Sequence, residues 1–181
     1  MPGPRTEVEV RALQRDDVDA LRAFFAHVPE GDRTFFREDV LASGVVERWL
    51  ADPDQHRLVA VVDSAIVGHV AVLRGVGWSR HVGEIRLVVD PEHRGRTIGR
   101  GLARQAVIDA VDLGLSKLIV EVISDQTGLI AMFRALGFDP EALLADHVRD
   151  RSGEVRDLMV LSNDVESQFS SMATAGITDQ I

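Results

Sequence analysis

A strand, a glycine-rich turn and a helix are predicted in the stretch Val88–Leu102, which reads VVDPEHRGRTIGRGL. The strand ends at Pro91, because proline has no N–H for a strand ladder. Helical spacing follows over about 98–113, and Gly114 stands at the position of a C-cap. The first amides of a helix have no partner within it and favour an anion, and glycines let the backbone approach that anion closely. The stretch therefore predicts a phosphate- or pyrophosphate-binding turn.

From Pro91 onwards, four arginines in or just after this stretch accompany a single acid, Glu92. They are Arg94, Arg96, Arg100 and Arg104. This basic cluster stands out in a chain with 20 Lys+Arg, 29 Asp+Glu and a formal net charge of −9. Two other nucleotide-binding motifs do not fit. A Walker A loop ends in Gly-Lys-Ser/Thr, and a dinucleotide fingerprint requires the spacing G-x-G-x-x-G, which Gly95, Gly99 and Gly101 lack.

Composition narrows the class of protein further. The chain has 181 residues, 45% of them apolar, which suits one domain with a sizeable core. It has no cysteine, which excludes a disulfide framework, a thiolate zinc site and a cysteine nucleophile. The excess of negative charge argues against nucleic-acid binding, and no apolar run provides a signal peptide or a membrane span. We therefore expect a cytoplasmic soluble domain with no membrane association and no metal.

The period of the apolar pattern divides the rest of the chain into helices and strands. Before residue 88, the predicted elements are a strand at 7–13, a helix at 18–28, and a helical stretch at about 36–50 with Ser43-Gly44 as a point of interruption. A hairpin of strands at 58–62 and 66–73 and a strand from 84 follow. After residue 113, they are a strand at 117–123, a helix at 127–136 and a hairpin of strands at 142–148 and 154–161. Pro29 and Gly31 are expected to end the first helix, and Pro140-Glu141 to begin a short helical turn. This order predicts one α/β domain over residues 1–165, with a loose tail at 166–181.

Two of these segments resemble motifs of a known family, the GNAT superfamily of acetyl-CoA-dependent N-acetyltransferases. The stretch 94–99 resembles its motif A, Gln/Arg-x-x-Gly-x-Gly/Ala: Arg94 and Gly99 match, while Thr97 replaces the first glycine. The strand at 117–123, followed by QTGLIAMFRALGF at 126–138, resembles its motif B. The order of elements fits the family from about residue 7 to residue 161.

The resemblance implies a mixed, mostly antiparallel sheet of six to seven strands with about four flanking helices. Its fourth and fifth strands would splay apart, with acetyl-CoA in the splay. The residues implied in cofactor binding are Leu87, Val88 and Val89 for pantetheine, Arg94, Gly95, Arg96, Thr97, Ile98, Gly99 and Arg100 for pyrophosphate, and Gln126 and Phe133 from motif B. The implied reaction is direct acetyl transfer to a primary amine of a small molecule or a protein.

An amine with a pKa near 10 is mostly protonated at pH 7, so the reaction needs a group that takes its proton. Glu84 is the candidate general base, because the family's catalytic glutamate often occupies this position of the strand; the alternative is that it pairs with a neighbouring arginine. His81 is a second candidate, since histidine titrates near neutral pH. For His69, within an apolar strand, a structural role is favoured.

The family's usual general acid is missing from this chain. Many members place a tyrosine on the motif B helix, but here that position is Phe133 and the chain has no tyrosine at all. Water or another donor would serve, or the thiolate would leave unassisted. Phe133 and Thr97, which depart from the family pattern, favour an alternative function: a non-catalytic acyl-CoA-binding module of the same fold.

The acceptor site and the oligomeric state are less determined by the sequence. The resemblance places much of the acceptor site on the first helices, within residues 16–50, and the polar segment 146–150 is expected to line the same cleft. The final hairpin has an exposed edge, which makes a homodimer a further hypothesis.

Overall fold

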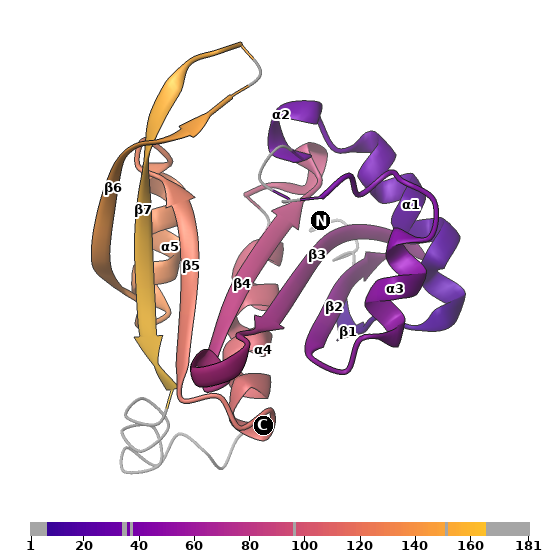
Figure 1. The fold of residues 1–181 in the computed structure, drawn as a ribbon. Coiled ribbons are helices and arrows are strands. Elements are labelled where there is room, and N and C mark those ends of the chain that lie inside the picture. Colours follow the sequence, from indigo (N-terminus) through magenta and orange to yellow (C-terminus); the bar gives the residue numbers. More distant parts are fainter. Residues whose placement is uncertain (1–6, 34–35, 37, 96, 151, 166–181) are drawn as a thin grey trace, which may run out of the picture.

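A computed structural model of the chain describes residues 7–33, 36, 38–95, 97–150 and 152–165 (Figure 1). The helices of this part are α1 (Val18–His27), α2 (Glu30–Arg33), α3 (Val45–Ala51), α4 (Ile98–Asp112) and α5 (Thr127–Ala135). The strands are β1 (Glu9–Ala12), β2 (Gln55–Val62), β3 (Ala65–Arg74), β4 (Val82–Val89), β5 (Lys117–Ile123), β6 (Asp139–Arg149) and β7 (Val155–Asp164). Short 3₁₀ turns lie at Arg15–Asp17, Gly77–Ser79 and Pro91–His93. The expected tail, 166–181, lies outside the described residues.

The seven strands form one sheet in the order β1-β2-β3-β4-β5-β7-β6. All neighbouring strands are antiparallel except β4 and β5, which are parallel because α4 connects them. The predicted mixed, mostly antiparallel sheet is therefore confirmed.

The parallel strands β4 and β5 pair over only half their length. Their register runs from Val82 opposite Lys117 to Ile85 opposite Val120. Beyond that point β4 stays paired with β3 as far as Val89, and β5 stays paired with β7. The two strands then diverge, so the sheet opens into two wings (Figure 1). The predicted splay between the fourth and fifth strands is present.

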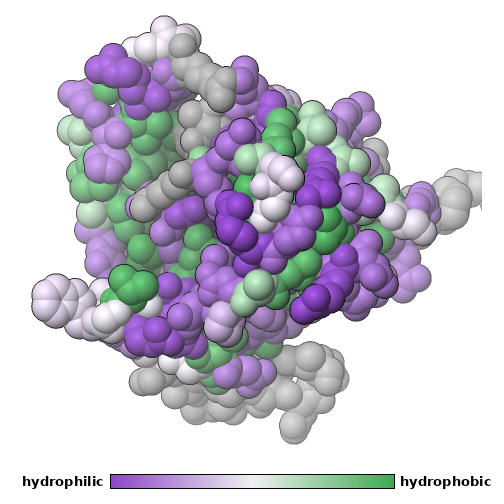
Figure 2. Space-filling model, turned by 45° about the vertical axis from the view of Figure 1, so that its right-hand side comes forward, coloured by the Kyte–Doolittle hydropathy of each residue, from purple (hydrophilic) through white to green (hydrophobic). Residues whose placement is uncertain are grey.

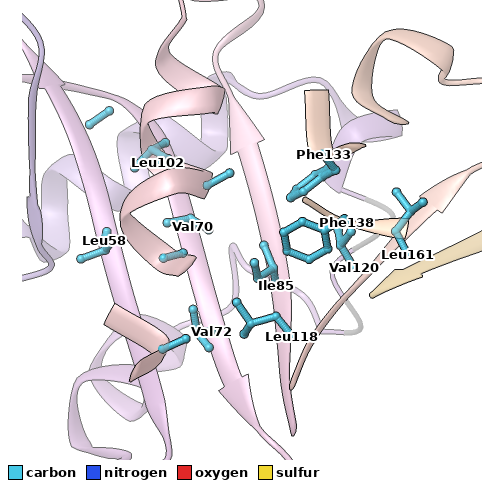
Figure 3. Packing of buried hydrophobic residues seen from close by; sticks show 14 of the residues in the cluster. Leu58, Val70, Val72, Ile85, Leu102, Leu118, Val120, Phe133, Phe138 and Leu161 are labelled. Atoms are coloured by element: carbon cyan, nitrogen blue, oxygen red, sulfur yellow. The ribbon is translucent and has the colours of Figure 1, made fainter. Parts of the chain in front are cut away.

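Two apolar cores hold the sheet between its helices. The larger core joins the sheet to α4 and α5, and its side chains include Ile85, Leu102, Val120 and Phe133 (Figure 3). The smaller core packs α1 and α3 against the opposite face of β2–β4, through Phe25 among others. Successive side chains of a strand point to opposite faces, so β4 and β5 each contribute one set of residues to the larger core and another to the face that α1 and α3 cover only in part.

Two local predictions are wrong. The expected helix at 36–50 is reduced to α3, because Gly44, at the expected interruption, takes a left-handed backbone (φ 78°) and the helix begins only at Val45. The first helix ends at His27, before Pro29, as predicted, and the short helix α2 follows it. Pro140 begins no helical turn; it lies in β6, an edge strand, where a missing N–H is tolerated.

None of the helices in the described part of the chain has the length and apolar character that crossing a bilayer requires.

Candidate active site

A groove of about 970 Å³ lies where β4 and β5 diverge. Its walls are the second half of β4, the turn before α4, the first residues of α4, and parts of β5 and α5. Asp32 and Phe36 close it on one side, and His147 and Val148 of the β6–β7 hairpin on the other. In the space-filling view, apolar side chains lie in the hollow between the two wings and hydrophilic side chains surround it (Figure 2). The expectation that the segment 146–150 lines the cleft is confirmed for His147 and Val148.

The structure brings together the residues that the sequence analysis associated with the cofactor. Those that line the groove are Leu87, Val88, Val89, Arg94, Gly95, Thr97, Ile98, Gly99, Arg100, Gln126 and Phe133. Arg96 lies outside the described residues. Arg104, two turns into α4 from Ile98, is exposed and is not one of the lining residues.

Two residues of the glycine-rich turn adopt the left-handed backbone region. Gly95 has φ 73° and Thr97 has φ 65°. The Thr97 carbonyl accepts a hydrogen bond from the Gly101 amide at 2.9 Å, which continues into the first turn of α4. The turn therefore leads the chain from β4 into α4 so that the start of the helix opens on the groove.

Thr97 is strained in this position, because a left-handed backbone costs an L-residue about 1–2 kcal/mol. Glycine avoids that cost but loses about 0.5–1 kcal/mol more backbone freedom on folding. We expect Thr97→Gly to raise the free energy of unfolding by up to about 1 kcal/mol in urea denaturation. Thr127→Gly is the control, because Thr127 is helical, and it should lower the free energy of unfolding. A comparable decrease in Thr97→Gly would show that the Thr97 backbone is not strained.

Arg94 ties the turn to α2. Its Nη2 lies 2.5 Å from Asp32 Oδ2, and its Nε donates to the Val89 carbonyl at 3.2 Å. Its backbone amide donates to the Pro91 carbonyl at 3.4 Å. The Arg94 side chain thus braces the end of β4 against α2, and the amides after Arg94 are better placed than its own to bind an anion.

Glu84 lies on the groove face of β4, in the half that is still paired with β5. It is opposite Leu73 on β3 and Ile119 on β5. Its Oε1 accepts a hydrogen bond from Arg86 Nε at 2.8 Å. The arginine pairing anticipated from the sequence is thus present, and Glu84 also lines the groove.

Glu121 is a further carboxylate on the groove, and it was not among the residues predicted from the sequence. Its β5 neighbours Val120 and Val122 point into the larger core, so Glu121 points to the face of the sheet that also carries Glu84. It directly follows Val120, the last β5 residue paired with β4, and therefore lies where the splay begins. The signal available was a carboxylate flanked by apolar residues within a central strand.

Comparison with known proteins decides the family. The model of the acetyltransferase (GNAT) family matches residues 18–138. The chain belongs to the GNAT family. It is 32% identical over 123 residues to a mycothiol acetyltransferase of Arthrobacter sp., covering 66% of this chain but only 37% of that protein's length. It is 28% identical over 143 residues to the N-alpha-acetyltransferase RimI of Mycobacterium tuberculosis, covering 78% of this chain and 85% of that protein.

Solved structures share the GNAT fold at low sequence identity. A ribosomal-protein-alanine N-acetyltransferase from Brucella melitensis matches with a TM-score of 0.75 and 21% identity, over 86% of this chain and 99% of that chain. The structure of yncA from Salmonella typhimurium, with its cofactor acetyl-CoA, matches with a TM-score of 0.70 and 21% identity, over 87% and 94% of the two chains.

The histidines differ in their relation to the GNAT groove. His69 is fully buried against Phe25 and Trp49, with ring centroids 5.5 and 5.8 Å away. Burial, and then the positive charge of Arg57, holds the pKa of His69 well below its ordinary value. The structural role favoured for His69 is confirmed. His81 is exposed just before β4, and the structure does not bring it into the groove lining.

Phe133 occupies the position of the tyrosine found in many GNAT proteins. It is fully buried, and its ring lies 5.1 Å from that of Phe138 in an edge-to-face arrangement. Figure 3 shows both rings beside Val120 in the larger core. Phe133 therefore supports the floor of the groove by packing and offers no proton.

Proposed function

We propose that this chain is an N-acetyltransferase that moves the acetyl group of acetyl-CoA directly to a primary amine. The observation that carries the proposal is the splay of β4 and β5, which opens on the glycine-rich turn at the start of α4. A strand edge without a partner strand can pair with the amides of pantetheine, and a helix start binds pyrophosphate. The relative yncA, which has the same fold, was solved with acetyl-CoA.

In this proposal, pantetheine pairs with the backbone of Leu87, Val88 and Val89. The pyrophosphate binds the amides between Gly95 and Gly99, with Arg96 and Arg100 supplying positive charge. Gln126, at the start of α5, offers an amide to the pantetheine. The transfer needs no metal, and we place the reaction in the cytoplasm, as suits a chain without cysteine.

Two carboxylates are positioned to accept the proton of the amine, and we favour Glu121. Glu84 Oε1 already accepts a hydrogen bond from Arg86 Nε at 2.8 Å, and Glu84 lies in the half of β4 that is still paired with β5. Glu121 lies at the opening of the splay, closer to where the thioester would lie. The deprotonated amine attacks the thioester carbonyl carbon, the carbon–sulfur bond breaks, and the CoA thiolate leaves. With Phe133 in place of tyrosine, we assign the protonation of that thiolate to water.

The names of the relatives suggest which amines to test. One relative is named an N-alpha-acetyltransferase, and others are named for ribosomal-protein alanine or for mycothiol. The chain spans 85% of the first protein's length but 37% and 50% of the two mycothiol acetyltransferases. We therefore propose that the acceptor is a primary amine, either at the terminus of a protein chain or on a small molecule.

The proposal is tested by turnover. Purified protein, acetyl-CoA and a panel of N-terminal peptides, amino acids and polyamines should release the free CoA thiol in equal amount to acetylated amine, detected by mass spectrometry. Acetyl-CoA binding without acetylated product from any amine would favour the non-catalytic acyl-CoA-binding module instead.

A further inference from the structure

Arg57 on β2 is a buried cation behind the wall of the groove. It is 7% exposed, and its guanidinium carbon lies 3.7 Å from the centre of the Trp49 ring. Its Nη1 lies 3.4 Å from His69 Nε2, and Nη2 donates to Gln55 Oε1. Its Nε is buried and has no hydrogen-bond partner among the described residues. None of these groups carries a negative charge.

The surroundings of Arg57 leave it positive and only partly compensated. Burial lowers the pKa of Arg57 to about 9, so the guanidinium is still protonated at neutral pH. Glu38 and Asp52 favour the charged form, whereas Arg86 disfavours it. Glu38 itself accepts a hydrogen bond from Trp49 Nε1 at 2.8 Å. A buried charge without a direct counterion is costly to a fold, which raises the question of what it serves.

Arg86 lies on the same face of the sheet, two strands away. Arg57 is opposite Ala71 on β3, and Ala71 is opposite Arg86 on β4, so the two arginines flank a methyl group. Two strand spacings place their backbones about 10 Å apart. Arg86 lines the groove, its side chain is 17% exposed, and its Nε is bound to Glu84. Its Nη atoms have no hydrogen bond among the described residues.

We propose that Arg86, supported by the charge of Arg57 behind it, binds an anionic group of the acceptor. The acceptor is then an amine that also carries a carboxylate or a phosphate. Arg86 is two residues along β4 from Glu84, and the two backbone positions are about 7 Å apart. A compact acceptor can therefore place its amine near Glu84 and Glu121 and its anionic group on Arg86. This inference rests on the proposed function, because it deepens the acceptor side of the same groove.

Binding of small anions tests the subsite without turnover. The Tm of the full chain with saturating acetyl-CoA is measured at increasing concentrations of malonate or of inorganic phosphate, with the ionic strength held constant by NaCl. Wild-type protein should show saturable stabilisation, and the more effective anion identifies carboxylate or phosphate as the ligand class. Arg86→Gln should weaken that anion about 10- to 100-fold, the value of one or two charge-assisted hydrogen bonds. Arg57→Met should weaken binding of the same anion less than Arg86→Gln does.

Arg22→Gln is the matched control, since Arg22 on α1 pairs with Glu47 outside the groove lining. It should bind the anion as wild type does. Equal anion affinity in Arg86→Gln and Arg22→Gln, or no saturable effect in wild type, overturns the subsite. If Arg57→Met does not fold, Arg86→Gln alone decides. A missing acetyl-CoA shift in wild type would instead count against the proposed function, so the two failures are distinguishable.

A kinetic comparison provides a second readout. Propylamine, β-alanine and 2-aminoethyl phosphate differ in the anionic group that accompanies a primary amine. Wild type should prefer one of the two anionic acceptors by about tenfold or more in kcat/KM, through KM. In Arg86→Gln, the ratio of kcat/KM for that anionic acceptor to kcat/KM for propylamine should fall to about one. A preference that survives Arg86→Gln would overturn the assignment.

Discussion

Glu121→Gln is expected to lower kcat by about 100- to 10,000-fold, the usual contribution of a positioned general base. Glutamine keeps the shape of the side chain but cannot accept the proton of the amine. The side chain points away from the larger core, so the fold should be retained. Because the change leaves the glycine-rich turn and the β4 edge intact, acetyl-CoA affinity should not change.

Glu84→Gln is the matched comparison, since it removes a carboxylate from the same face of the sheet. We expect a loss of about tenfold, corresponding to one weakened charge-assisted hydrogen bond with Arg86. Single-turnover kinetics with a primary amine, together with acetyl-CoA titrations, separate chemistry from binding. A large loss in Glu84→Gln and none in Glu121→Gln would reassign the base to Glu84. Unchanged rates in both variants would contradict a carboxylate base.

Gly99→Val is expected to weaken acetyl-CoA binding by at least about 100-fold. A Cβ at Gly99 would lie 3.4 Å from Val89 Cγ2 and 3.7 Å from both Leu87 Cδ2 and Met132 Sδ. These are contacts that the fold tolerates, but they fill the space between α4, β4 and α5 through which the cofactor would pass. The two methyl groups of valine would keep the pyrophosphate away from the backbone. We expect this to weaken the free energy of acetyl-CoA binding by about 3 kcal/mol or more.

Gly101→Val is the control for this variant. A Cβ at Gly101 meets nothing within 4 Å, and Gly101 is exposed on the same helix. Calorimetric titration with acetyl-CoA should give wild-type affinity for Gly101→Val and none measurable for Gly99→Val, with Gly99→Ala between them. Equal affinities in all four proteins would mean that the cofactor does not pass Gly99.

Much of the fold follows from local sequence patterns. The strand β5 has the predicted bounds Lys117–Ile123, and α4 begins at the predicted Ile98. The helix α4 has a clear helical period and β5 is a near-continuous apolar run, and in both the apolar pattern and the neighbouring turns agree. The turn at 94–99 is recognisable because its glycines and arginines resemble a family motif and do not follow a core pattern.

Other features depend on contacts between distant segments. The sequence of 36–50 indicates an interruption at Ser43-Gly44, but it does not show that the helix begins only after Gly44. The position of Glu121 at the opening of the splay is set by where β4 stops pairing with β5, which no single strand sequence contains. The stacking of Arg57 on Trp49 joins a strand to a helix and is likewise invisible in either segment.

A thermal melt with acetyl-CoA tests whether the splay and the glycine-rich turn bind this cofactor. At about 100 times its dissociation constant, a ligand of the native state stabilises by about 2.7 kcal/mol. For a domain of this size, we expect Tm to rise by about 5–10 °C for wild type and not at all for Gly99→Val. No rise in wild type up to millimolar acetyl-CoA, with none from longer acyl-CoA thioesters, would mean that the groove does not bind the cofactor.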